Sequence, residues 1–167
     1  SLAFPRTAGG PESARQDARD LITAELEDAG YEVQTQSVDL NGVDSPNLYV
    51  ELPGTECADR TIVIGAHYDS AHATGPGADD NASGVAATME LARALVEHPL
   101  PVTVRFASWS YEEVGDVGSF AMAKSMKADG RDVVGAISLE MLGFTKPDVD
   151  PLTGTPSTYL GMISDPS

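Results

Sequence analysis

The sequence predicts an α/β protein with a mixed, mainly parallel central sheet and helices on both faces. After Thr61, short apolar, β-branched runs alternate with longer helical patterns, an order that produces parallel strand pairing. Before that point, the Asn41-Gly42 dipeptide between alternating segments indicates a hairpin, and therefore an antiparallel part of the sheet. The 167 residues can bury one core, so we expect residues 1–167 to form a single domain.

The first part of the chain is predicted to contain one helix and three strands. Apolar residues recur at helical spacing from Pro11 until Gly30, where a glycine is expected to end the helix. Alternation over residues 31–40 predicts a half-buried strand, and residues 48–52 predict the strand that returns from the hairpin. The short apolar run Thr61–Ile64 predicts a buried strand.

The second part is predicted to alternate helices and strands. A helix that is apolar around much of its surface begins near Ser83 and ends at His98-Pro99. A strand follows over residues 102–109, then a helix over residues 120–127. Residues 133–139 predict a strong strand, and residues 160–163 predict one more.

Composition excludes several classes of partner. The net charge is −16 with only three lysines, which argues against nucleic acid, because phosphate contacts need a basic face. No apolar run approaches the roughly 18 residues that span a bilayer, so no membrane segment is expected. An acidic, lysine-poor surface is typical of proteins adapted to high salt. The single cysteine, Cys57, cannot form an internal disulfide, and the compartment stays open.

Polar side chains that can bind metal stand directly after three of the predicted strands, those at residues 61–64, 102–109 and 133–139. Two more end the loop that follows the strand at residues 61–64. They are His67, Asp69, Asp79, Asp80, Glu112, Glu113 and Glu140. Because the carboxyl ends of parallel strands meet at one sheet edge, we expect these groups to converge. So many like charges need a strong cation between them. Histidine with carboxylates favours zinc, cobalt or manganese over calcium.

Each of these residues also has an ordinary structural interpretation. A histidine after a strand is more often a hydrogen-bonded edge residue, and an Asp-Asp-Asn loop is more often turn chemistry. The pair Glu112-Glu113 by itself resembles a solvated surface. Glu140 is less ordinary, because an acid directly after a buried strand needs a partner. Their common position at successive strand ends favours the metal site.

Three motifs, in this order, resemble the signature of the di-zinc aminopeptidase family. They are His67-Tyr68-Asp69, Gly77-Ala78-Asp79-Asp80-Asn81-Ala82-Ser83-Gly84 and Glu112-Glu113-Val114-Gly115-Asp116-Val117-Gly118-Ser119. The segment Pro5–Gly10 also resembles the N-terminal segment of the family. This family includes bacterial leucyl aminopeptidases and, more distantly, glutamate carboxypeptidase II and glutaminyl cyclases. The resemblance implies a zinc-exopeptidase fold, two zinc ions, with cobalt or manganese as substitutes, and a peptide or aminoacyl substrate.

The resemblance implies a role for each residue. His67 and Glu140 would bind the first metal ion, although many family members have Asp at the position of Glu140. Asp79 would bridge both ions, and Glu113 would bind the second. Glu112 would be the general base, which takes a proton from a metal-bound water and passes it to the leaving amine.

Two further expectations concern the surroundings of the metal ligands. Asp69 would hold the ring of His67, and Asp80 is placed with it in a supporting role beside the ligands. The family commonly has a cis peptide between the residues that correspond to Asp79 and Asp80. A non-proline cis bond is uncommon, so it marks a functional site.

The chain departs from the family in its histidines. The last metal ligand of the family is a histidine well past the position of Glu140, whereas the only histidines here are His67, His72 and His98. Neither His72 nor His98 matches the motif. Family members also continue for roughly another hundred residues by the same resemblance. We therefore expect a catalytic domain that lacks its C-terminal part, with the first metal site more complete than the second.

Three functions stay open at this point. The first is a metallo-aminopeptidase, and the second is another amide hydrolase or a glutaminyl cyclase with the same motifs. The third is a binding module that kept the fold without catalysis, which the missing histidine favours and the intact Glu112-Glu113 pair opposes. An incomplete sheet would also leave an exposed edge, through which the chain could self-associate.

Overall fold

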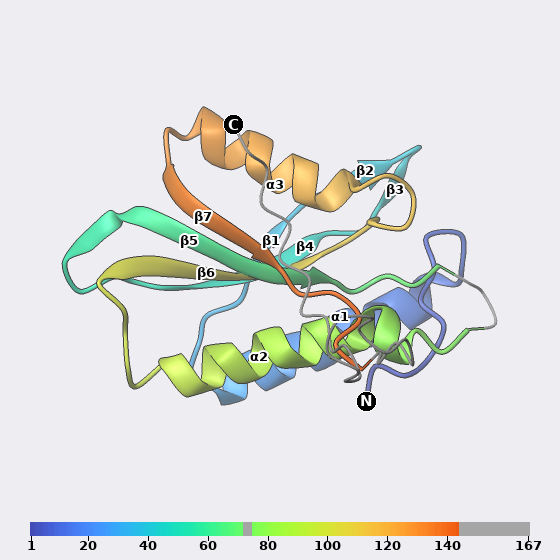
Figure 1. Cartoon of the computed structure of the whole chain (residues 1–167). Helices are drawn as coiled ribbons and strands as arrows, with labels where there is room; N and C mark the ends of the chain where they lie inside the picture. Colours follow the sequence, from blue (N-terminus) through green and yellow to red (C-terminus); the bar gives the residue numbers. More distant parts are fainter. Residues whose placement is uncertain (72–74, 144–167) are drawn as a thin grey trace, which may run out of the picture.

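The protein is built around a five-stranded sheet, and the computed structural model describes residues 1–71 and 75–143. The strands of this sheet are β1 (Gln34–Gln36), β4 (Asn47–Leu52), β5 (Cys57–His67), β6 (Val102–Trp109) and β7 (Asp132–Ser138). The helices are α1 (Glu12–Asp28), η1 (Ala78–Ser83, a π-helical turn), α2 (Gly84–Leu95) and α3 (Val117–Ala128). Helices α1 and α2 cover one face of the sheet, and α3 covers the other (Figure 1).

The sheet is mixed, as predicted, with the order β1-β4-β6-β5-β7. Strand β5 pairs in parallel with β6 and with β7, whereas β4 is antiparallel to both β1 and β6. The carboxyl ends of β5, β6 and β7 therefore lie at the same edge of the sheet. The predicted class, an α/β sheet with helices on both faces, is confirmed.

The predicted strand over residues 31–40 is divided in two. Strand β1 joins the main sheet, while β2 (Asp39–Leu40) and β3 (Val43–Asp44) form a separate two-stranded sheet around the predicted Asn41-Gly42 turn. The division occurs because the Asp44 carboxylate accepts the backbone N–H of Val38 at 3.0 Å and the Ser37 hydroxyl at 2.6 Å. These side-chain bonds replace a continuous ladder and bend the chain between the two sheets.

The larger core lies between the sheet and the helices α1 and α2. Its fully buried members include Ile22 from α1, Val85 from α2 and Phe106 from β6. A smaller core, which includes Met122 and Met126, packs α3 against the opposite face. Apolar side chains at helical spacing on both faces thus hold the three parallel strands in register.

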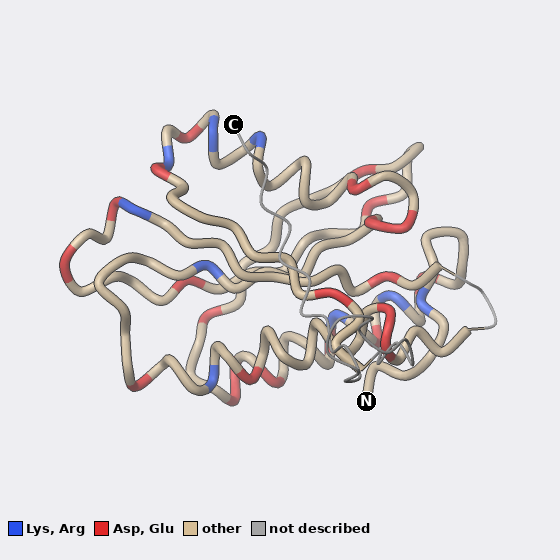
Figure 2. Tube along the Cα trace, in the orientation of Figure 1, with Lys and Arg blue, Asp and Glu red and all other residues tan. Residues whose placement is uncertain are grey.

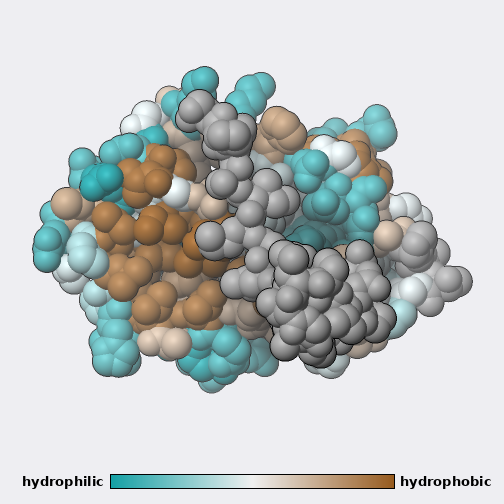
Figure 3. Space-filling view, in the orientation of Figure 1, coloured by the Kyte–Doolittle hydropathy of each residue, from teal (hydrophilic) through white to brown (hydrophobic). Residues whose placement is uncertain are grey.

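Strand β7 lies at one edge of the sheet within the described residues. Its Val133 and Val134 are 42% and 40% exposed, although parallel strands are normally covered on both faces. In Figure 3 an apolar area lies over the region that β7 occupies in Figure 1. Self-association through this edge stays a prediction, and the predicted strand at residues 160–163 lies outside the described residues.

Acidic residues are distributed over helices, loops and strand ends (Figure 2). The site described below contains a minority of the 26 acidic residues, so it does not account for the net charge of −16. No helix in the described part of the chain is long and apolar enough to span a bilayer.

Candidate metal centre

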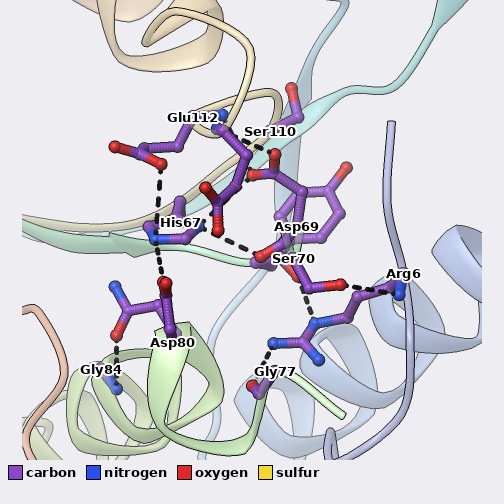
Figure 4. Close-up of polar contacts among 12 residues, drawn as sticks. Arg6, His67, Asp69, Ser70, Gly77, Asp80, Gly84, Ser110 and Glu112 are labelled. Atoms are coloured by element: carbon purple, nitrogen blue, oxygen red, sulfur yellow. Dashed lines mark hydrogen bonds and ion pairs between the residues drawn. The ribbon is translucent and has the colours of Figure 1, made fainter. Parts of the chain in front are cut away.

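His67 is the residue around which the site is assembled. It is the last residue of β5, and its side chain is 2% exposed. The Nδ1 atom lies 3.1 Å from the Asp69 carbonyl and 3.5 Å from the Asp69 carboxylate. The Nε2 atom faces three other carboxylates, those of Asp80 at 3.2 Å, Glu140 at 3.4 Å and Glu112 at 3.7 Å. Figure 4 shows Asp80 and Glu112 beside the ring. The predicted convergence at the strand ends is therefore present.

Asp69 connects the histidine to the loop that carries the glutamate pair. The Asp69 side chain is buried, and its two oxygens accept the backbone N–H groups of Glu112 at 3.1 Å and Glu113 at 3.2 Å. The family resemblance implied only that Asp69 holds the ring of His67. A carboxylate has several acceptor sites, so Asp69 can bond the backbone of the glutamate pair and also face the ring of His67. Asp69 therefore fixes the loop after β6 relative to the end of β5.

Replacing Asp69 by Asn is expected to destabilise the protein by about 1.5–3 kcal/mol, the size of a hydrogen bond to a charged group. The amide offers one acceptor oxygen, so one backbone N–H of the glutamate pair is left buried without its partner. Urea denaturation measures the change, with Asp59→Asn as the control because Asp59 is exposed at the start of β5. Equal midpoints for the two variants would contradict this role of Asp69.

The structure places Asp80, and not Asp79, in the cluster around His67. The Asp79 carboxylate accepts the backbone N–H of Gly143 at 2.7 Å and the Ser83 hydroxyl at 3.2 Å. Asp80 has non-helical torsions (φ −103°, ψ 92°), and its carboxylate lies beside Nε2 of His67. The torsions of η1 therefore direct the side chain of Asp80 towards His67 and that of Asp79 away from it. The sequence analysis expected the opposite for these two residues.

The cis peptide bond also lies one residue later than expected. It joins Asp80 to Asn81, and not Asp79 to Asp80. The prediction of a non-proline cis bond in this segment is right, but its position is corrected.

Asn81 was not assigned to the site by the sequence analysis. It is fully buried, and its Nδ2 donates to the Leu139 carbonyl at 2.8 Å and to the Glu140 carboxylate at 2.9 Å. Its Oδ1 accepts the backbone N–H of Gly84 at 3.1 Å. An amide has both donors and an acceptor, so Asn81 connects the start of α2 to the residues after β7 and holds Glu140 in place. The available signal was its position directly after the two aspartates.

The electrostatics of the cluster favour a cation. Burial alone lowers the pKa of His67, but hydrogen bonds with Asp69 and Glu140 outweigh it and raise this pKa to about 10. Burial, partly offset by attraction to His67, raises the pKa of Glu112. Burial and repulsion from Asp80 raise the pKa of Glu113. Negative charge is thus in excess around His67, and a positive charge placed there is stabilised.

The donor set fits a zinc ion. Two groups of three ligand atoms lie within 4.8 Å of one another, one from His67, Asp80 and Glu140 and one from His67, Glu112 and Glu113. The Oε1 atom of Glu113 is buried and has no hydrogen-bond partner among the described residues, as expected of an oxygen kept for a metal. Imidazole nitrogen with carboxylate oxygen is a ligand set that zinc accepts.

His98, the other histidine in the described part of the chain, does not belong to this cluster. His98 is exposed beyond the C-terminal end of α2, whereas the N-terminal end of that helix adjoins the site. Twelve helical residues separate the two ends by about 18 Å. His72 lies outside the described residues.

Residues 47–160 match the model of Peptidase family M28. A protein named leucine aminopeptidase 1 from Fusarium vanettenii is 36% identical over 131 residues, which cover 71% of this chain and 32% of that protein. A probable zinc metalloprotease from Pyrenophora teres f. teres is 30% identical over 151 residues, covering 77% of this chain and 32% of that protein.

The fold agrees with a solved structure. The crystal structure of the Legionella pneumophila LapA aminopeptidase superimposes with a TM-score of 0.71 at 25% identity, covering 83% of this chain and 39% of LapA. This chain spans about a third of the length of the curated relatives above. The family match covers more than half of the chain and includes every residue of the cluster around His67. The chain therefore belongs to peptidase family M28.

Proposed function

We propose that the protein is a zinc-dependent aminopeptidase, which hydrolyses the peptide bond that follows an N-terminal residue. The observation that carries the proposal is the position of Asp80, Glu112 and Glu140 around Nε2 of His67. Membership of peptidase family M28 and likeness to a protein named leucine aminopeptidase support a peptide substrate. Because this chain spans about a third of such relatives, the activity of the whole protein is itself part of the proposal.

The proposed metal ligands come from four segments of the chain. We assign the first zinc ion to His67, Asp80 and Glu140, whose ligand atoms lie together. Asp80 would take the bridging role that the family resemblance implied for Asp79, because its carboxylate is the one beside His67. Glu113, with its buried and unpartnered Oε1, is assigned to the second ion.

Glu112 is the proposed general base. When bound, zinc supplies Lewis acidity, which lowers the pKa of a water molecule and polarises a carbonyl group. The Glu112 side chain is 37% exposed, so water and substrate reach it, while its backbone is held by Asp69. Its raised pKa suits a carboxylate that accepts a proton from the attacking water and returns it to the leaving amine.

The excess of carboxylates also suits the substrate. A peptide with a free N-terminus brings an α-ammonium group, and negative charge near the site attracts it. An acylated N-terminus is neutral and loses this attraction, so the proposed enzyme should prefer peptides with a free N-terminus, as an aminopeptidase does.

The test joins metal content to hydrolysis. After dialysis against zinc, elemental analysis should find bound zinc in the wild type and in His98→Ala, but not in His67→Ala. This pair is matched because both histidines are truncated alike and only His67 lies in the cluster. Hydrolysis of leucine p-nitroanilide should follow the zinc content. Zinc retained by His67→Ala contradicts the site, and cyclisation of N-terminal glutamine without peptide hydrolysis identifies a glutaminyl cyclase instead.

A further inference from the structure

Arg6 lies between the two segments that present His67 and Asp80 (Figure 4). Its Nε donates to the carbonyl of Tyr68, the residue directly after β5. Its Nη2 donates at 2.9 Å to the carbonyl of Gly77, the residue directly before η1. One planar group therefore joins the strand end that carries the histidine to the turn that carries the aspartate.

The chemistry of these contacts requires an arginine. Arg6 is 1% exposed, and within the described part of the chain its guanidinium makes no ion pair. A buried charge is costly unless its hydrogen bonds are satisfied. Its Nη1 donates to the carbonyls of Leu2 at 2.6 Å, Phe4 at 2.9 Å and Pro76 at 3.2 Å, so one of the two N–H groups on this atom is shared between two carbonyls. Only a guanidinium has five donors in a rigid fork that can reach all of these carbonyls at once.

The backbone around Arg6 is fixed in the same way. The Arg6 backbone N–H donates to the Ser70 hydroxyl at 3.0 Å, which ties the N-terminal segment to the residues after β5. Gly77 has φ +54°, and a Cβ atom there would come within 2.9 Å of Nη1 of Arg6. The turn before η1 is thus packed directly on the guanidinium, without room for a side chain.

We propose that Arg6 is a positioning residue, which sets the distance between His67 and Asp80 and with it the affinity for metal. This inference rests on the proposed function, because it concerns the same metal site. Arg6 donates to no side chain of the cluster and acts through the backbone of Tyr68 and Gly77. Outer partners that orient metal ligands typically contribute about 10–100-fold to metal affinity.

The test compares two buried arginines of the same N-terminal region. Arg15 is 4% exposed, and its Nη1 donates to the carbonyls of Thr7, Ala8 and Gly10, none of which adjoins the metal cluster. Arg6→Met and Arg15→Met should both lower the urea midpoint. Only Arg6→Met should weaken zinc binding, by about 10–100-fold in competition with a chromogenic chelator. Equal zinc affinities of the two variants would overturn the proposal.

A second variant tests the proposal if Arg6→Met does not fold, and a metal-free measurement tests it if the wild type binds no zinc. Arg6→Lys keeps the buried charge, but an ammonium cannot reach Tyr68 and Gly77 together, so it should weaken zinc binding while the fold is kept. Wild-type affinity in Arg6→Lys overturns the proposal. If the wild type binds no zinc, the proposed function fails, and hydrogen exchange still tests Arg6. Amides of residues 77–84 should then exchange faster in Arg6→Lys than in Arg15→Lys, and equal rates overturn the proposal.

Discussion

Replacing Glu112 by Gln is expected to remove nearly all turnover while the zinc content stays unchanged. Removal of a general acid–base group typically lowers the rate about 10²–10⁴-fold, and glutamine cannot accept the proton. The fold should persist, because the interaction that holds this loop is the bond from the Glu112 backbone N–H to Asp69, which the substitution keeps. Steady-state hydrolysis of leucine p-nitroanilide, with elemental zinc analysis of the same sample, measures both quantities.

The adjacent residue provides the matched control. Glu113→Gln changes the same atoms one residue later, but it makes neutral the buried carboxylate that we assign to the second zinc ion and replaces one of its two oxygens by an amide nitrogen. We expect this variant to lose the second zinc ion together with activity, whereas Glu112→Gln loses activity alone. Full turnover in Glu112→Gln would contradict the assignment of Glu112 as the general base. Loss of zinc in Glu112→Gln would instead make Glu112 a ligand.

The parallel part of the fold was predictable because each of its elements has a strong local pattern. The apolar run at Thr61–Ile64 and the alternation over residues 102–109 lie in β5 and β6, and the apolar helix near Ser83 is α2. Parallel strands place their carboxyl ends together. The order of the elements was therefore sufficient to bring His67, Glu112 and Glu140 to one edge before any contact was known.

The division of the early strand was not predictable from alternation. Residues 31–40 keep a strand-like pattern, but the carboxylate of Asp44 bonds the backbone of Val38 and ends the ladder there. An exposed sheet edge was expected, but the apolar pattern of residues 133–139 did not indicate that β7 is the strand at that edge, where Val133 is 42% exposed. Both features depend on which segments meet in space, and a local pattern does not contain that information.

The roles of Arg6 and Asn81 were missed for a related reason. Both residues act through hydrogen bonds to distant backbone atoms, Arg6 to Gly77 and Asn81 to Leu139. The periodicity of apolar residues indicates which side chains are buried, but it does not indicate which carbonyl groups a polar side chain bonds. The polar side chains that fix a site are therefore visible only when the segments have been placed.

The different positions of Asp79 and Asp80 give the sharpest test of the site, in which each aspartate is replaced by asparagine in turn. Asp80→Asn should lower zinc affinity by more than the roughly 10–100-fold that loss of an outer partner costs, because an amide is neutral and cannot bridge two cations through two oxygens. Asp79→Asn should leave zinc affinity nearly unchanged. Its amide oxygen can still accept the N–H of Gly143, the contact made at 2.7 Å by Asp79. Competition with a chromogenic chelator measures both affinities.

Comparison of these two variants tests whether zinc affinity depends on the direction of each aspartate side chain or only on the presence of two aspartates. Asp79 and Asp80 are adjacent, carry the same charge and undergo the same substitution, so any difference in zinc affinity comes from where η1 directs each side chain. Asp80 lies 3.2 Å from Nε2 of His67, whereas Asp79 is bonded to Ser83 and Gly143. If Asp79→Asn loses zinc and Asp80→Asn keeps it, the bridging role returns to Asp79. The torsions of η1 would then have to change when metal binds, because in the present geometry Asp79 is bonded away from the histidine.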